Sequence, residues 1–327
     1  MLLAVLLFVR CFAADGTVCD TRGKGAYSMD YRSAEEMARR WGLSVRTVRS
    51  YCRLGKIPGA HQVGRVWLIP EQAQRPLRKV RAVKKPDKMT LLDVLQAECS
   101  SHQKGGIYHR VQIDMTYNSN HIEGSRLTHE ETRYIFETNT IGREAPVNAN
   151  DIVETMNHFR CMDYIIEMAR HPLSEKMIKD LHLMLKNGTT DSRKSWFAVG
   201  AYKKLPNTIG EQETTAPNQV SAAIRALLSW YKAIEHPTFD DLLEFHVRFE
   251  RIHPFQDGNG RVGRLLLFKE CLRTDHVPFI ITDDLKYYYY RGLKEWGHES
   301  GYLRDTCLTA QDRFRKLLAY YRPDLGH

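Results

Sequence analysis

Over residues 89–327, apolar residues recur at the spacing of helices, and few stretches alternate as strands do. One helix is predicted around 91–95, and a second over 174–186 carries its apolar residues on one face. A third is predicted over 242–251, with Thr238 and the residues that follow it as the N-terminal cap. We expect this part of the chain to form one mainly helical domain.

Two short helices are predicted near the start of the chain. Ser33 and Glu36 form a capping box, and Gly42 ends the helix that the box opens. Ser44 then caps a second helix over 45–52. A pair of short helices joined by Gly-Leu-Ser is typical of a helix-turn-helix.

An alternating stretch over 62–70 follows, and Gly64 and Arg65 predict the turn of a small hairpin or wing within it. The domain, 29–75, resembles the winged helix-turn-helix of the excisionase and MerR type. The resemblance implies binding to double-stranded DNA. The side chains of the second helix available for that contact are Arg46, Thr47, Arg49, Ser50 and Arg53.

Positive charge is concentrated around this domain. Residues 29–88 hold 15 Lys and Arg against 5 Asp and Glu, whereas residues 89–327 hold 30 against 32. We interpret the basic stretch 76–88, which starts at a proline, as a linker that either follows DNA phosphates or stays hydrated. Because basic modules of this size also bind proteins, and a charge run is usually a solvated face, protein contact stays open beside DNA binding.

The seven cysteines are scattered without a C-x-x-C pair, which argues against a zinc site or a disulfide framework and favours the cytoplasm. The apolar run at 2–9 is too short to span a bilayer, and nothing basic precedes it as a signal peptide would require. We interpret 1–28 as a non-native or disordered extension, with translation starting at Met29. No membrane association is expected.

Candidate functional residues are most concentrated at 253–264, which reads His-Pro-Phe-Gln-Asp-Gly-Asn-Gly-Arg-Val-Gly-Arg. Gly258 and Gly260, with Asn259 as the non-glycine residue most tolerant of positive φ, let backbone N–H groups converge on an anion. The helix predicted after them, 261–268, points its positive end at the same place. Backbone N–H groups and a helix N-terminus that converge in this way are suited to bind a polyphosphate.

Side chains of the same run supply the rest of such a site. Arg261 and Arg264 lie three residues apart on one helix face, so both can reach one phosphate chain. Asp257 offers a hard oxygen ligand to Mg²⁺. His253 is the group of the run that can accept a proton near neutral pH, which makes it the candidate base.

The run matches the Fic family motif, His-x-Phe-x-Asp/Glu-Gly-Asn-Gly-Arg-x-x-Arg, at every fixed position, and the resemblance covers about 119–293. It implies an all-helical core that transfers AMP from ATP to a Ser, Thr or Tyr hydroxyl of a target protein or of itself. In that mechanism His253 takes the proton, Asp257 holds Mg²⁺, and the two arginines neutralise the β- and γ-phosphates. The implied nucleotide-binding residues of the motif are Asp257, Gly258, Asn259, Gly260, Arg261 and Arg264.

Upstream of the motif, residues 119–124 read Ser-Asn-His-Ile-Glu-Gly and fit the inhibitory signature of the family, Ser/Thr-x-x-x-Glu-Gly/Asn. The resemblance implies a helix near 115–124 that lays Glu123 across the nucleotide pocket, paired with Arg264. That carboxylate and the γ-phosphate of ATP compete for one guanidinium. The residues assigned to inhibition are Ser119, Glu123 and Gly124. An ordinary helix-end role for Glu123 stays open.

Residues 200–210 correspond in place to the flap of the family, a hairpin that clamps the target by backbone pairing. Pro206 removes one donor, so the pairing edge is expected after it. That edge consists of Asn207, Thr208, Ile209 and Gly210. Tyr289 lies by spacing where related enzymes place an aromatic near adenine, and core packing is expected of at least two of the tyrosines at 287–290.

Other interpretations stay open beside AMP transfer. The core could be a catalytically idle nucleotide sensor for the DNA-binding domain, or a transferase that moves phosphate or phosphocholine. His253 speaks against an idle core, and Asp257 with Gly260 favours AMP. His246 is expected to be a packed core histidine with no metal role. The target, the operator and the oligomeric state are not predicted, and a homodimer is one of the states left open.

Overall fold

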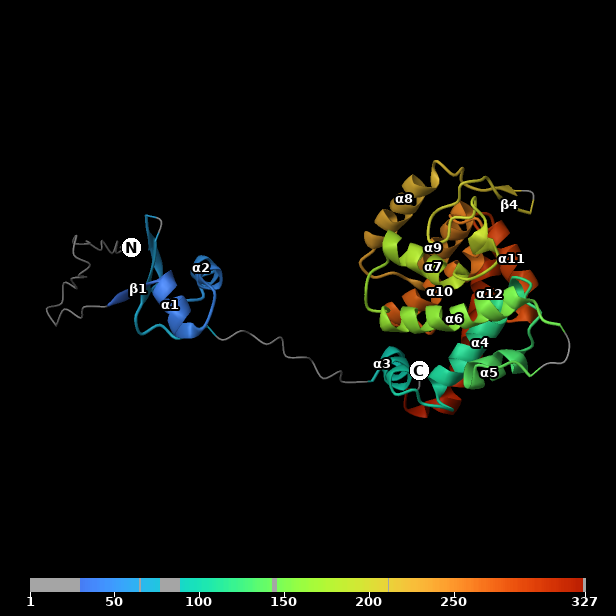
Figure 1. Ribbon diagram of the computed structural model, residues 1–327, viewed down its shortest axis with the longest axis horizontal. Helices are drawn as coiled ribbons and strands as arrows, with labels where there is room; N and C mark the ends of the chain where they lie inside the picture. Colours follow the sequence, from blue (N-terminus) through green and yellow to red (C-terminus); the bar gives the residue numbers. More distant parts are fainter. Residues whose placement is uncertain (1–29, 65, 77–88, 143–145, 211, 326–327) are drawn as a thin grey trace, which may run out of the picture. The chain divides into compact units, whose positions relative to one another are not determined.

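The computed structural model describes residues 30–64, 66–76, 89–142, 146–210 and 212–325. The predicted extension at 1–28 and all of the predicted linker except Pro76 lie outside these residues. Two compact units divide the chain, one within 1–85 and the other within 86–327 (Figure 1). The described residues are mainly helical, which confirms the predicted fold class.

The first unit packs two helices against a three-stranded antiparallel sheet of strand order β1-β3-β2. Its elements are β1 (Tyr31–Ser33), α1 (Ala34–Trp41), α2 (Val45–Arg53), β2 (His61–Val63) and β3 (Val66–Pro70). Met37, Val48 and Ile69 form the centre of its core. The predicted hairpin is β2 and β3, whereas β1 was not predicted because a three-residue strand shows too little alternation.

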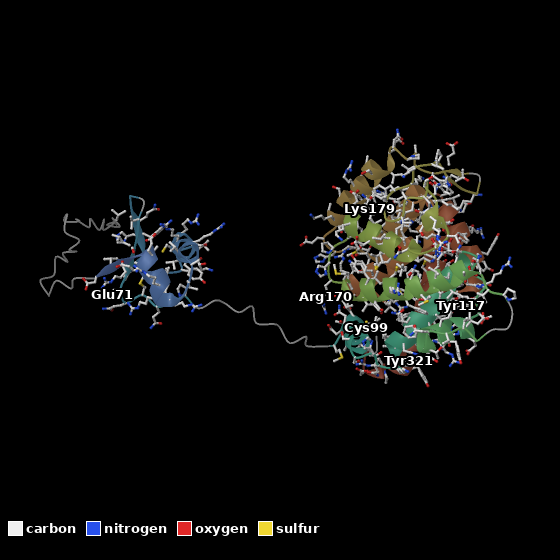
Figure 2. The ribbon with its side chains drawn as sticks, viewed as in Figure 1. Glu71, Cys99, Tyr117, Arg170, Lys179 and Tyr321 are labelled. Carbon is white, nitrogen blue, oxygen red and sulfur yellow. The ribbon has the colours of Figure 1, made fainter. Side chains whose placement is uncertain are left out.

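The predicted caps define the helices of this unit. Ser33 Oγ accepts a hydrogen bond from Glu36 N at 3.2 Å, and Glu36 Oε2 accepts one from Ser33 N at 2.8 Å. Gly42 ends α1 with φ 63°. Glu71, labelled in Figure 2, accepts a hydrogen bond from Arg32 Nη2 at 2.9 Å and so ties the end of β3 to β1.

The second unit is built from helices, with one two-stranded hairpin. Its helices are α3 (Leu91–Ser100), α4 (Ile107–Ile122), α5 (His129–Thr138), α6 (Ala149–Glu167), α7 (Glu175–Lys186), α8 (Val220–Lys232), α9 (Phe239–Ile252), α10 (Asn259–Arg273), α11 (Lys286–Glu295) and α12 (Gly301–Tyr321). The hairpin is β4 (Thr208–Ile209) and β5 (Gln212–Glu213). Single turns of 3₁₀ helix are η1 (Asp191–Arg193), η2 (Asp283–Leu285) and η3 (Pro323–Leu325).

Helix α10 lies at the centre of this unit, packed against α6, α7 and α9 (Figure 1). It is buried on nearly every face, and Leu265, Leu266 and Phe268 are almost wholly buried. The sequence predicted its start at Arg261, but it begins at Asn259 because Gly258 adopts φ 81° and caps it. A buried central helix holds its N-terminus in a fixed position, and the candidate site is built there.

Helix α9 leads into the same place. Thr238 accepts a hydrogen bond from Asp241 N and forms a capping box, so the helix begins at Phe239, three residues before the predicted start. Helix α7 closely matches its prediction, with Ser174 as the cap. Within the described residues, no helix combines the length and apolar character needed to cross a bilayer.

Candidate active site

The loop between α9 and α10 is held by its own side chains. His253 ends α9 in the left-handed region, with φ 50°, which turns the chain sharply. Asn259 Oδ1 accepts from Phe255 N at 2.7 Å, and Asn259 Nδ2 donates to Phe255 O at 2.8 Å. The Phe255 ring is fully buried and stacks on His182 at 3.9 Å between centroids. These contacts fix the loop without any ligand.

This geometry corrects two expectations. Asn259 and Gly260 do not adopt positive φ, because they are the first residues of α10, and only Gly258 of the three does. The Asn259 side chain closes the loop on Phe255, and both of its polar atoms are bonded there. The groups available to an anion are therefore the first backbone N–H groups of α10, at its positive end.

His253 faces a cavity of about 790 Å³. Its Nδ1 lies 3.2 Å from Glu250 O. Because a carbonyl only accepts, this contact assigns the ring hydrogen to Nδ1 and leaves Nε2 as the proton acceptor. Burial lowers the pKa of His253, partly offset by the Glu250 carbonyl. The imidazole is therefore mostly neutral at pH 7, as a base must be.

The cavity brings together parts of the chain that are far apart in sequence. Its walls include His253, Gly260 and Arg264 of the motif region, Glu123 after α4, the β4–β5 hairpin, and Tyr290 and Leu293 of α11. A volume of this size is ample for a nucleotide. Asp257, Gly258, Asn259 and Arg261 are not among its lining residues.

Glu123 covers the N-terminus of α10. Its Oε1 lies 2.8 Å from Arg264 Nη2, which is the pairing that the family resemblance implies. Arg264 also donates from Nε to Ser119 Oγ at 3.1 Å and from Nη2 to Ser119 O at 2.9 Å. A Cβ placed on Gly260 would collide with Glu123 Oε1. The carboxylate therefore lies where an anion bound by these N–H groups would lie.

The end of α4 positions this carboxylate. Glu123 is the C-terminal cap residue of the helix, and Gly124 turns the chain away with φ 98°. The Arg264 side chain is 5% exposed and the Glu123 side chain 26% exposed. Burial would lower the pKa of Arg264, but Glu123, together with Tyr289 and Tyr290, outweighs burial and the pKa is raised. The ion pair is closely formed, but the Glu123 carboxylate is accessible enough for another anion to replace it at Arg264.

Arg261 faces a different set of partners. Its guanidinium pairs with Glu154 and, at 3.4 Å, with Asp257 Oδ2. Lys186 pairs with the same two carboxylates and lies 2.6 Å from Asp257 Oδ2. The expectation that Arg261 and Arg264 both point at one phosphate chain is therefore not met in this structure. Glu154 and Lys186 carry no motif, so the sequence did not identify them.

Asp257 could hold a metal ion. Burial would raise its pKa, but Arg261 and Lys186 outweigh burial and hold the pKa at about 2. The side chain is 46% exposed, so it remains accessible beside these cations. Within the described residues no group of three His, Cys, Asp or Glu forms a complete metal site. One carboxylate fits Mg²⁺ when phosphates supply the other ligands.

Glu250 was also not predicted. The residue lines the cavity, and its Oε1 is buried without a hydrogen-bond partner in the described part of the chain. Burial raises its pKa to about 8, and Glu123 adds to the shift, so the carboxyl group is mostly neutral at pH 7. His246 is fully buried against Tyr289, with Nε2 2.6 Å from its hydroxyl, as expected of a core histidine.

The tyrosines of α11 differ from expectation. Tyr289 is 1% exposed and is the buried member of the four, so core packing applies to one tyrosine and not to two. Tyr287, Tyr288 and Tyr290 are exposed. Tyr289 and Tyr290 both line the cavity, and Tyr290, at 40% exposed, is the more accessible of the two. Tyr290 is therefore the better candidate for contact with the adenine ring of a nucleotide.

The hairpin forms where the flap was predicted. Thr208 pairs with Glu213 and Ile209 with Gln212 in antiparallel register, and Gly210 has φ 58° at the turn. Asn207 lies directly before β4 and anchors the hairpin, because its Nδ2 donates to Phe255 O at 2.9 Å.

The first unit presents a basic helix face. Arg46, Arg49 and Arg53 of α2 are exposed, and Thr47 and Ser50 are partly exposed. Arg49 Nη2 lies 2.6 Å from Glu35 Oε1, and Thr47 Oγ1 lies 2.8 Å from Ser44 Oγ. The wing turn contains Arg65, which lies outside the described residues.

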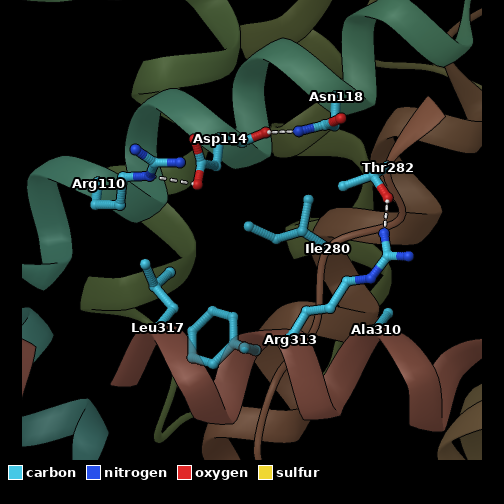
Figure 3. A pocket seen from close by; sticks show the side chains of 9 residues that line it. Arg110, Asp114, Asn118, Ile280, Thr282, Ala310, Arg313 and Leu317 are labelled. Carbon is cyan, nitrogen blue, oxygen red and sulfur yellow. Dashed lines mark hydrogen bonds and ion pairs between the residues drawn. The ribbon is translucent and has the colours of Figure 1, made fainter. Parts of the chain in front are cut away.

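A second cavity, about 210 Å³, lies between α4 and α12 (Figure 3). Ile280, Phe314 and Leu317 form its apolar part, and none of the predicted site residues lines it. Its two guanidiniums are already paired, Arg110 with Asp114 and Arg313 with Asp284. The candidate active site is therefore the larger cavity, which His253, Arg264 and Glu123 line.

Comparison with known proteins agrees with both units. The model of the Fic/DOC family matches residues 172–270, and that of a helix-turn-helix domain matches residues 33–73. The protein adenylyltransferase Fic of Nematostella vectensis is 24% identical over 187 residues, which cover 56% of this chain and 42% of that protein. Its namesake from Drosophila willistoni is 28% identical over 187 residues, which cover 54% and 35%. The matches span less than half the length of these relatives.

Solved structures share the fold of the second unit. A Fic domain containing signaling protein from Bacteroides thetaiotaomicron aligns with a TM-score of 0.52 at 24% identity and covers 72% of this chain and 93% of that one. Fic-1 from C. elegans aligns with a TM-score of 0.54 at 19% identity and covers 71% of each chain. Identities this low establish the fold and nothing further.

Proposed function

We propose that this chain, which carries a Fic domain and an N-terminal helix-turn-helix domain, transfers AMP from ATP to a hydroxyl side chain of a target protein. The observation that carries the proposal is one cavity lined by a neutral imidazole, the N-terminus of a buried helix and a buried guanidinium. These are the base and the phosphate-binding groups that nucleotidyl transfer needs. The similarity to protein adenylyltransferases supports the same reaction.

His253 is the base in this proposal. Nε2 takes the proton of a Ser, Thr or Tyr hydroxyl as that oxygen attacks the α-phosphorus. The bond from the α-phosphorus to the bridging oxygen breaks, and pyrophosphate leaves with the electron pair. Because Nδ1 is held by Glu250 O, the ring stays in the orientation and tautomer that present Nε2 to the cavity.

The phosphates bind at the start of α10. Backbone N–H groups at Gly258, Asn259 and Gly260 are the proposed contacts of the α-phosphate, with the helix dipole in their favour. Arg264 takes a terminal phosphate once Glu123 has left it. Arg261 does not bind the phosphates directly, since its guanidinium is already paired with Glu154. It acts on them through its positive charge and through its contact with Asp257.

Mg²⁺ is the proposed metal, with Asp257 as its protein ligand. The bound ion would neutralise phosphate charge. Lys186 and Arg261 keep the Asp257 carboxylate ionised and oriented by their hydrogen bonds. The β4–β5 hairpin is the proposed docking edge for the target segment, through Thr208 and Ile209.

Glu123 makes the resting protein autoinhibited in this proposal. Its carboxylate already occupies the guanidinium and the helix N-terminus that a terminal phosphate would use. A nucleotide that binds beside it has its phosphates wrongly presented for in-line attack. Release of Glu123 is therefore the activating step.

The helix-turn-helix domain is proposed to bind double-stranded DNA in the cytoplasm. Its support is the row of exposed arginines on α2, Arg46, Arg49 and Arg53. Arg49 would exchange its exposed pairing with Glu35 for a phosphate, at little cost.

Labelled ATP tests the proposed reaction. We expect protein-bound label from ATP labelled at the α-phosphate and none from ATP labelled at the γ-phosphate, with a cell extract supplying targets. Label from γ alone would indicate phosphorylation, and label from neither would favour a nucleotide sensor. His253→Ala is the control, and label that persists in that variant contradicts the role of His253 as base.

A further inference from the structure

The side chain of Lys203 is a buried cation at the base of the hairpin. The residue is 3% exposed. Its Nζ donates to Asn207 Oδ1 at 2.6 Å and to Thr214 Oγ1 at 2.5 Å, both neutral oxygens. Across the described ranges of the chain, no carboxylate oxygen lies within 4.0 Å of this ammonium group. Because a buried charge without a counter-charge is costly, its position calls for a physical reason.

Contacts around Lys203 connect the hairpin to the catalytic loop. Lys203 N donates to Pro254 O at 2.9 Å, directly after His253. Asn207, which accepts from Lys203 Nζ, donates from Nδ2 to Phe255 O at 2.9 Å. Thr214 donates to Asn207 Oδ1 at 2.6 Å and closes the other side of the hairpin. Lys203 therefore orients the amide that holds the hairpin against the loop.

The charge of Lys203 also acts on His253. Burial is the main cause of the low pKa of His253, and Lys203 lowers it further, whereas Glu123 and Asp257 raise it. The remaining titratable or charged side chains that line the same cavity are Glu250 and Arg251 of α9, Arg264 of α10, and Tyr289, Tyr290 and Lys294 of α11. Two carboxylates thus favour the protonated imidazole, and a nearby buried ammonium group opposes them.

We propose that Lys203 is a positioning residue for His253: its ammonium group fixes the hairpin to the 253–259 loop and, through its charge, keeps the imidazole in the form that accepts a proton. The proposal rests on the proposed function, in which His253 is the base. Burial lowers the pKa of Lys203 itself to about 8, so the lysine is mostly charged at pH 7. Its neighbour Lys204 is exposed.

A titration of His253 tests the charge effect without any reaction. The midpoint is followed by NMR on protein with labelled histidine, in the absence of ATP, and the signal is assigned by its loss in His253→Gln. We expect Lys203→Met to raise the midpoint by about 0.5 to 1 pH unit, less than charges in direct contact produce. Lys203→Arg keeps the charge and should leave the midpoint near that of the parent protein.

Matched variants separate the effect of the Lys203 charge on His253 from the effect of losing its hydrogen bonds. Lys204→Met removes the same charge from an exposed position and should not move the midpoint. If Lys203→Met does not fold, Lys203→Gln retains a hydrogen-bond donor to Asn207 and Thr214 and answers the same question. A midpoint unchanged in a folded neutral variant, or moved equally by Lys203→Arg, overturns the charge effect.

The rate of AMP transfer then tests the positioning role. The acid limb of the pH–rate profile should move to higher pH in Lys203→Met, in step with the midpoint, and stay in place in Lys203→Arg. A shifted midpoint without any AMP transfer in the parent protein would mean that the proposed function has failed while the electrostatic effect stands. A shifted midpoint with an unshifted acid limb would overturn the role of Lys203 in catalysis.

Discussion

The pairing of Glu123 with Arg264 predicts that Glu123→Gly activates the enzyme. The pair is one charge-assisted hydrogen bond of 2.8 Å, with the guanidinium buried and the carboxylate 26% exposed. Such bonds contribute roughly 1.5 to 3 kcal/mol, and partial exposure favours the lower half of that range. About 1.5 to 2 kcal/mol corresponds to an increase of about 10- to 30-fold in AMP transfer. Label incorporated from α-labelled ATP measures it.

Three controls isolate the carboxylate. Glu123→Gln keeps the size of the side chain without its charge and should activate less. Ser119→Ala removes a contact of Arg264 but leaves the carboxylate, so it should activate little. Arg264→Ala should not activate, because it frees Glu123 and also removes a phosphate contact. An equal or slower Glu123→Gly enzyme with an intact thermal transition would refute the inhibitory role and leave Glu123 as a helix-end residue.

Three further predictions concern other parts of the chain. Because burial lowers the pKa of His253, AMP transfer should be lost only as pH falls below about 6.5, where the base takes up a proton; an acid limb above pH 7 in the pH–rate profile would contradict this. Arg46→Ala with Arg49→Ala should weaken DNA binding and reduce its salt slope by roughly 2, with self-labelling unchanged, as measured by salt-dependent fluorescence anisotropy. Gly292→Ala should cost about 1 to 3 kcal/mol of stability in thermal unfolding, since its Cβ would lie 2.6 Å from the backbone of α12, whereas Gly301→Ala meets only a flexible side chain and should cost little.

Local patterns of the sequence predicted the local structure well. The capping box at Ser33 was read directly from the chain, because its contacts lie three residues apart. The cap at Thr238 was also predicted, but the helix it opens begins three residues before the predicted start. The motif run likewise predicted a loop followed by a helix, because its glycines and its apolar stretch are contiguous. Thr208 and Ile209 fell in a hairpin as expected, although Asn207 proved to be its anchor.

Contacts between distant segments could not be predicted in the same way. Arg261 pairs with Glu154, which lies 107 residues earlier in the chain and carries no signature of its own. Lys186 was visible as the end of a predicted helix, but nothing in that pattern indicated that it would face Asp257. The Glu123–Arg264 contact joins residues 141 positions apart, and only the family resemblance pointed to it.

The two motif arginines, Arg261 and Arg264, have different partners in the fold and therefore different proposed roles. Arg261 and Arg264 share a helix face by spacing. Glu154 of α6 and Asp257 of the loop before α10 supply carboxylates to Arg261, whereas Glu123 at the end of α4 supplies one to Arg264. The partners of Arg261 form a buried network with Lys186, and removing any member would leave an uncompensated charge. Glu123 caps the end of α4 directly before Gly124, and its ion pair in the described residues is with Arg264. When Glu123 leaves, a phosphate can replace it as the counter-charge of that guanidinium. The proposed exchange of Glu123 for a phosphate therefore takes place at Arg264, while Arg261 holds Asp257 in place.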